Sequence, residues 1–236
     1  MRIVDSTMDP MLNPTLIIGE FEWREPVTTL TDSLTASVFI FAFIVFSRYK
    51  GKKSESFIYF KAFFLCFAVG MLCAAWFGHG LAAYVTPRWK AIGWVINSTA
   101  NLFLGLATLK EIAPLIKSHM LRLIKVIFIL QVSIFVVLMI IPNTSFFGLA
   151  QLCSAVSLLC MILPMHIFNF YKTKASGSKF FIIAIGMGVL PGIIFNAQLS
   201  VNPWFNYHDI SHVVMATIFF VIFLAARKFS FLKQHN

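Results

Sequence analysis

The sequence predicts an all-α, polytopic membrane protein with seven transmembrane helices, its N-terminus outside and its C-terminus cytoplasmic. Of the 236 residues, 59% are hydrophobic and only 12% are charged, and the mean hydropathy is +0.84. Soluble domains carry about 25% charged residues, so this composition excludes the soluble globular class. The other two observations are a series of long apolar stretches and an uneven distribution of Lys and Arg.

Seven apolar stretches are long enough to cross a bilayer, which takes roughly 17–25 residues each. They cover residues 27–47, 57–85, 91–109, 121–141, 146–170, 180–200 and 203–226. Their connections are short, so a separate soluble domain is not expected. The chain is therefore expected to divide into three parts: an acidic extracytoplasmic segment (1–26), a transmembrane domain (27–227) and a basic cytoplasmic tail (228–236).

Proline and its neighbours predict where several helices begin and end. Glu25-Pro26 favours a helix start, and Thr86-Pro87 favours the end of the second helix. Asn202-Pro203 is typical of an N-cap followed by proline at the first helical position, so we expect the seventh helix to begin there.

Two further prolines lie inside predicted helices. Pro164 predicts a kink in the fifth, and Pro191, within GMGVLPG, predicts a kink or opening in the outer half of the sixth. The four cysteines all lie in apolar runs, which indicates small core residues of helices and neither disulfides nor a thiolate metal site. They are Cys66, Cys73, Cys153 and Cys160.

The basic residues set the predicted orientation. Fifteen of the 19 Lys and Arg fall in loops or helix ends on one side of the membrane, and only Arg2, Arg24, Arg88 and Lys90 fall on the other. The positive-inside rule makes the first side cytoplasmic. The net charge of +10 is therefore a topology signal and does not indicate nucleic-acid binding.

The stretch NYHDISHVV, residues 206–214, contains two histidines four residues apart, His208 and His212. On a helix this spacing places both imidazoles on one face. At 1.5 Å per residue, they lie roughly 8 and 14 Å below the predicted start of the seventh helix. His79 and Asp32 reach roughly 9 Å into their own helices, and Asn97 about 14 Å. We therefore expect polar groups from four helices to meet near the outer face.

Three histidines from two helices are typical of a catalytic zinc site, in which water takes the fourth position. Such a water can have a pKa near 7 and attack a carbonyl group. Asp32 has no Lys or Arg at its depth, so its expected partner is a metal, a histidine or a shared proton. Asp209 follows His208 directly and is expected behind the ligands or facing the first helix. The alternative is a set of interfacial histidines without a metal.

Other polar residues have simpler interpretations. Glu20, Glu22 and Glu25 form either a solvated acidic lead-in or an oxygen-rich site for calcium as a second cation. His166 falls in the cytoplasmic half and is expected to be a hydrogen-bonded core residue. A haem-binding electron carrier would need histidines on facing helices with room for a ring between them.

The positions of His79, His208 and His212 resemble those of the CREST superfamily, the seven-helix membrane hydrolases that include alkaline ceramidases and adiponectin-receptor-like proteins. The segment Glu22-Trp23-Arg24-Glu25 is similar to the calcium-binding N-terminus of the ceramidases. The resemblance implies a zinc site and a lipid substrate. The chain departs from the family pattern at two catalytic positions, where Ala75 replaces a serine and Lys90 an aspartate.

Two functions are therefore expected. The first is a zinc-dependent intramembrane hydrolase of a lipid amide or ester, with metal-bound water as the nucleophile and Asp32 or Asp209 as the general base. The second is a non-catalytic lipid sensor or receptor of the same fold, in which the metal has only a structural role. The two missing family residues favour the second function.

Overall fold

The computed structural model describes residues 2–4, 14–86, 88–141 and 147–231. Within them, seven helical spans are long and apolar enough to cross a membrane, which confirms the predicted class. The helical elements are α1 (Pro26–Arg48), α2 (Phe57–Cys73), the π-helical η2 (Ala74–Gly80), α3 (Arg88–Ile112), the 3₁₀ turn η3 (Ala113–Leu115), α4 (Ser118–Ile140), α5 (Phe147–Ala155), the π-helical η4 (Val156–Ile162), α6 (Leu163–Thr173), α7 (Ser176–Met187), α8 (Val189–Asn196) and α9 (Tyr207–Ser230).

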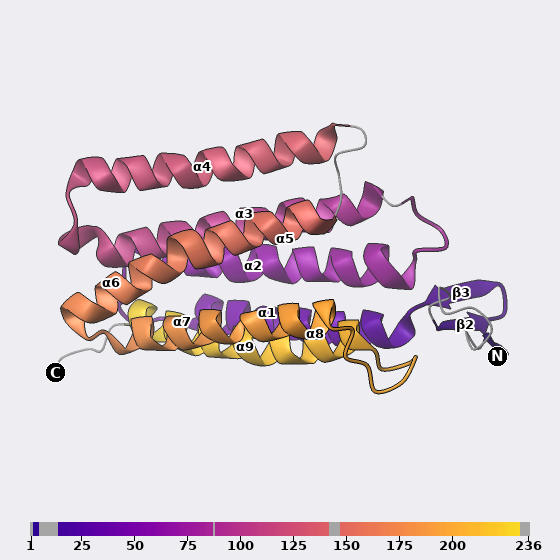
Figure 1. Ribbon diagram of the computed structural model, residues 1–236. Coiled ribbons are helices and arrows are strands. Elements are labelled where there is room, and N and C mark those ends of the chain that lie inside the picture. Colours follow the sequence, from indigo (N-terminus) through magenta and orange to yellow (C-terminus); the bar gives the residue numbers. More distant parts are fainter. Residues whose placement is uncertain (1, 5–13, 87, 142–146, 232–236) are drawn as a thin grey trace.

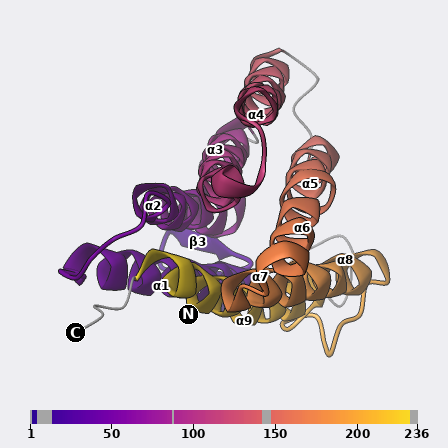
Figure 2. The ribbon, with the colours of Figure 1, turned by 90° about the vertical axis from the view of Figure 1, so that its left-hand side faces the viewer.

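The helices run nearly parallel or antiparallel along one long axis (Figure 1). Seen along that axis, α2, α3 and α4 form one arm, and α5 and α6 form another (Figure 2). The base where the arms meet contains α1, α7 and α9. The N-terminal strands and the end of α9 lie at opposite ends of the bundle.

A small antiparallel sheet precedes the first helix, where the sequence predicted only an acidic lead-in. Its strands are β1 (Arg2–Val4), β2 (Thr15–Ile18) and β3 (Phe21–Arg24), in the order β1-β2-β3. Leu16 pairs with Trp23 between β2 and β3. The polypeptide is thus mostly, but not wholly, α-helical.

Two predicted helix ends at the sheet's end of the bundle were wrong. The second span ends at Gly80, before Thr86; Pro87 lies outside the described residues. The seventh helix begins at Tyr207 and not at Pro203. The side chain of Asn202 accepts hydrogen bonds from the backbone N–H groups of the next turn, so it closes an Asx turn.

The N-cap of α9 is Asn206. Its side-chain oxygen accepts from the N–H of His208 at 2.8 Å, and its own N–H donates to Asp209 Oδ2 at 2.7 Å. This reciprocal capping box satisfies two backbone donors at the helix start. At its far end, α9 continues to Ser230, beyond the predicted boundary at residue 227.

Both predicted helix distortions are present as changes of hydrogen-bonding pattern. The sixth span is divided at Gly188, three residues before Pro191, into α7 and α8. In the fifth span, the π-helical η4 immediately precedes α6, which has Pro164 in its first turn. Gln131 of α4 donates to the Cys153 carbonyl and to Ser157 Oγ, both at 2.8 Å, and so joins α4 to α5 and η4.

The core is built largely from phenylalanine. Phe39 of α1 is fully buried, stacks on Phe67 at 4.6 Å and contacts Phe219 of α9 at 4.5 Å. Close helix contact also depends on glycine: a Cβ on Gly93 would lie 3.0 Å from the Gly70 carbonyl oxygen. These contacts hold the first, second, third and seventh spans together.

His166 has the core position that the sequence predicted. It is fully buried, and its ring nitrogens lie 3.2 Å from Thr108 Oγ1 and Ser178 Oγ. All four cysteines are free. Cys160, however, is exposed on the bundle surface and is not a core residue.

Candidate functional site

Three imidazoles meet between η2 and the first turns of α9. The ring centroids of His79 and His208 are 6.0 Å apart, those of His79 and His212 6.3 Å, and those of His208 and His212 6.5 Å. The HxxxH spacing places two of the rings on one face of α9, as predicted. The π-helical turn η2 presents the third ring to that face.

Asp32 of α1 lies against two of these rings. Its Oδ1 is 3.2 Å from His212 Nε2, and its Oδ2 is 3.7 Å from His79 Nε2. The residue is only 2% exposed, and Oδ1 accepts no hydrogen bond within the described part of the chain. A carboxylate oxygen buried in this way is costly, which marks the space between the rings as a place for a proton or a cation.

Glu25 holds His79 from the other side. Its Oε2 contacts His79 Nδ1, and its backbone has a φ of +44°, a conformation that non-glycine residues rarely adopt. Burial raises the pKa of Glu25, but the hydrogen bond and charge of His79 lower it more, so the pKa lies below its usual value. An ionised carboxylate can only accept, so His79 Nδ1 donates to Glu25 while Nε2 faces Asp32.

His212 is oriented by a similar relay. Its Nδ1 lies 3.2 Å from Thr31 Oγ1, which also lies 3.3 Å from Asp209 Oδ1. When Thr31 donates to Asp209, it accepts from the imidazole, and His212 Nε2 has its lone pair toward Asp32. Both rings then present Nε2 to the same buried carboxylate, with their Nδ1 atoms fixed by partners outside the cluster.

Asp209 faces the first helix, as the sequence suggested, whereas Asn97 does not join the cluster. Both oxygens of Asp209 are engaged, one by the capping box and the other by Thr31 of α1, so it lies behind the histidine rings. Asn97 packs between α2 and α3, where its Nδ2 lies 3.8 Å from Met71 Sδ. Of the two residues expected at the depth of the histidines, Asp32 contacts them, whereas the Asn97 side chain packs against Met71 of α2.

The predicted depths of the histidines were too large. Because α9 begins at Tyr207, His208 is the second residue of the helix and His212 lies only about one turn further on. His79 is the next-to-last residue of its span. The cluster thus lies at the end of the bundle, closer to the helix ends than the sequence suggested.

The β2–β3 hairpin covers this end. Tyr84 accepts a hydrogen bond from the Glu22 N–H at 2.6 Å and stacks on Phe21 at 5.7 Å. Trp23 stacks on Trp76 of η2 at 6.2 Å, and its indole N–H donates to Thr29 Oγ1. These contacts attach the hairpin to the segment that carries His79.

The three N-terminal glutamates do not act as one group. The Glu22 carboxylate pairs with Arg24 at 2.7 Å, whereas that of Glu25 contacts His79. Glu20 lies at the exposed turn between the strands. A calcium site formed by all three remains a prediction from the sequence.

Among the described residues, no group of three or more His, Cys, Asp or Glu side chains is already arranged to hold a metal ion. Three imidazoles on one zinc, with Zn–N of about 2.0–2.1 Å, have ring centroids roughly 5–5.5 Å apart. The observed triangle of 6.0–6.5 Å is wider by about one ångström.

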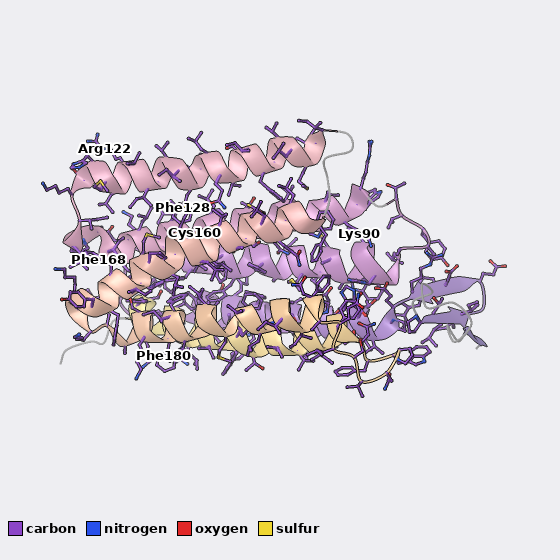
Figure 3. The ribbon with its side chains drawn as sticks, viewed as in Figure 1. Lys90, Arg122, Phe128, Cys160, Phe168 and Phe180 are labelled. Atoms are coloured by element: carbon purple, nitrogen blue, oxygen red, sulfur yellow. The ribbon has the colours of Figure 1, made fainter. Side chains whose placement is uncertain are left out.

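The two positions that depart from the resembled family also lie near this end. Ala75 is fully buried in η2, one turn before His79. Lys90 lies near the start of α3, and Figure 3 shows it at the end of the bundle that carries the histidines. Its charge contributes to the lowered pKa of Glu25.

The fold and the site together define a seven-helix membrane-type protein with a histidine–carboxylate cluster at one end of its bundle. The chain belongs to the family of unknown function DUF6962, whose model matches residues 27–230. Comparisons with curated proteins and with solved structures give no match.

The role of Glu25 was not recognised from the sequence, which grouped it with the other glutamates. Helical spacing could not have revealed it, because Glu25 precedes α1 and has a left-handed backbone. The hairpin and the π-helical register of η2 had no clear sequence signal.

Proposed function

We propose that this protein is a zinc-dependent intramembrane hydrolase of a lipid amide or ester. The observation that supports this most strongly is the buried Asp32 carboxylate between two imidazoles, with a third completing the triangle. Membrane-buried ionisable groups are costly and usually serve function. The resemblance to the CREST hydrolases supports the same assignment.

The residues fit a zinc ion. The Nε2 atoms of His79 and His212 both face the Asp32 carboxylate, at 3.7 and 3.2 Å. With neutral rings, a cation would take the place of a proton between the nitrogens and the carboxylate, and His208 would supply the third imidazole. Bound zinc would lower the pKa of a water molecule and polarise a carbonyl group. Glu25 and Thr31 would keep the ligating nitrogens unprotonated.

Asp32 is the residue that we propose as general base. Its carboxylate is buried, faces the centre of the cluster and has an oxygen with no hydrogen bond in the described chain. It can therefore take a proton from an attacking water and return it to the leaving group. Asp209 is less suited, because both its oxygens are already engaged.

A lipid would reach the cluster sideways, past α8. Phe195 of α8 contacts the ring of His208 at 5.2 Å, and Ser211 donates to the Pro191 carbonyl. Leu190 and Ile193 of α8 are about half exposed. In the proposed topology the N-terminus and the cluster face the outside or a lumen, and the C-terminus is cytoplasmic.

Metal content and turnover test the proposal together. Purified wild type is expected to carry about one zinc per chain, and His79→Ala and His212→Ala to lose it. His119→Ala is the matched control, since His119 is exposed at the start of α4. A panel of ceramides, acyl amides and lysolipids then tests for products. Equal metal content in all four proteins would refute the zinc site.

A non-catalytic lipid sensor is the second candidate, favoured by Ala75 and Lys90 at the positions of the family's serine and aspartate. The metal would then hold η2 against α9 without supporting chemistry. Saturable binding of one lipid class by metal-loaded protein, without products on prolonged incubation, would select this function over the hydrolase.

A further inference from the structure

A second candidate site lies at the other end of the bundle. A cavity of about 190 Å³ opens between α2, α3 and α4, lined by Tyr59, Leu106, Leu109, Lys110, Ala113, Leu121, Arg122 and Lys125. Arg122, one of its residues, is at the end opposite Lys90 (Figure 3). The cavity is thus separate from the histidine cluster.

The lining combines a cationic rim with an apolar interior. Lys110 comes from α3, while Arg122 and Lys125 come from α4 and, three residues apart, share one face. Leu109 is buried and Leu121 half-buried, so the walls below the rim are hydrocarbon. One charged end above an apolar pocket matches the two parts of an amphiphile.

Two of the three cations of the rim have no ion-pair partner among the described residues. Lys110 is paired with Glu55 at 2.8 Å, but Arg122 and Lys125 make no ion pair with any described residue. Both are exposed at the first turns of α4, a helix whose outward face bears Leu123, Val126, Ile127 and Leu130. Two cations at the edge of a lipid-facing helix attract an anionic headgroup.

We propose that this cavity binds one anionic phospholipid. Its phosphate would lie between Arg122 and Lys125, where the guanidinium can donate two hydrogen bonds. Tyr59 offers a hydroxyl at the same rim. The start of an acyl chain would lie against Leu106, Leu109 and Ala113, and so fill the space between α4 and its neighbours. The proposal is independent of zinc and of the hydrolase function.

Native mass spectrometry of the detergent-solubilised protein tests this. Titration with phosphatidylglycerol is expected to show one tightly retained lipid, and phosphatidylcholine to bind more weakly. The double variant Arg122→Gln/Lys125→Gln should weaken phosphatidylglycerol binding about 10- to 30-fold, as expected for two cations near a lipid headgroup. Lys172→Gln/Lys179→Gln, with the same charge change at exposed positions of α6 and α7, should alter it less than about twofold.

A second variant separates a lipid from a free anion. Ala113→Phe would fill the apolar part of the cavity, so it should reduce phosphatidylglycerol binding but leave inorganic phosphate binding unchanged. Three results would overturn the proposal. They are an equal loss of affinity in both double variants, equal retention of the two lipids, and competition by phosphate at the same concentration as the lipid. A thermal unfolding scan shows whether each variant remains folded.

Discussion

Asp32 Oδ1 lies 3.2 Å from His212 Nε2 across the contact between α1 and α9. This relationship joins the first and last transmembrane spans, 180 positions apart in the chain. Helix α1 contacts both ring nitrogens of His212: Asp32 lies at Nε2, and Thr31 lies at Nδ1. The position of α9 relative to α1 therefore determines how His212 meets Asp32.

Replacing Asp32 by Asn is expected to abolish hydrolysis while the metal stays bound. The amide keeps the volume of the side chain but cannot accept a proton, so turnover should fall about 10²- to 10⁴-fold. Metal content and product formation are measured on the same preparation. Loss of the metal in this variant would instead make Asp32 a ligand or a structural residue.

Glu25 predicts a dependence of stability on acid. Its pKa is lowered from the ordinary value of 4.5, so its ionised form stabilises the folded protein. That contribution is complete above pH 4.5 and is lost as the pH falls below it through the lower native pKa. Thermal unfolding of wild type and Glu25→Gln, followed between about pH 6 and pH 3, should show the difference between them shrinking toward acid.

Glu22→Gln is the control for that titration, because Glu22 lies on the same hairpin with an exposed carboxylate. It should follow wild type throughout. Parallel curves for wild type and Glu25→Gln over the whole range would contradict the role assigned to the Glu25–His79 contact.

Gly93→Ala should destabilise the contact of α2 with α3. The new methyl group would lie 3.0 Å from the Gly70 carbonyl and 3.2 Å from the Ala74 backbone nitrogen, neither of which can turn away. We expect a cost of about 1–3 kcal/mol, read as a lower thermal midpoint in detergent. Gly186→Ala is the matched control, since nothing lies within 4 Å of its added methyl group. The control should be neutral or slightly stabilising.

Gln131→Leu removes the hydrogen bonds that join α4 to α5 and η4. Gln131 Nε2 donates to the Cys153 carbonyl of α5 and to Ser157 Oγ of η4, both at 2.8 Å. Interhelical hydrogen bonds of this kind contribute about 0.6–1.7 kcal/mol in membrane proteins. The expected result is a loss of that size, measured by thermal unfolding. Ser133→Ala, at an exposed position of α4, should change nothing measurable.

The sequence was sufficient for the seven spans and for the approach of His79, Asp32, His208 and His212. Span length and hydropathy are properties of single segments, and depth follows from counting residues. The predicted start of α9 was wrong because Asn202-Pro203 has the local pattern of an N-cap followed by proline. The observed cap at Asn206 is stabilised by Asp209, and Asp209 is in turn held by Thr31 of α1. Such a choice depends on contacts between distant segments.

The N-terminal hairpin could not be predicted for a related reason. Two short strands are marginally stable on their own. These are stabilised by rings of other elements, through the stacking of Phe21 on Tyr84 and of Trp23 on Trp76. Glu25 follows the hairpin, and its partner was therefore hidden as well.

The π-helical turn η2 has one more residue per turn than an α-helix would place there. Had Ala74–Gly80 continued as α-helix, His79 would point roughly a quarter turn away from His208 and His212. The direction of this ring is thus encoded by chain length and not only by residue identity. Deleting one residue between Cys73 and His79 would let this segment wind as ordinary α-helix and still present the ring to α9, because the wider π-helical turn accommodates one extra residue.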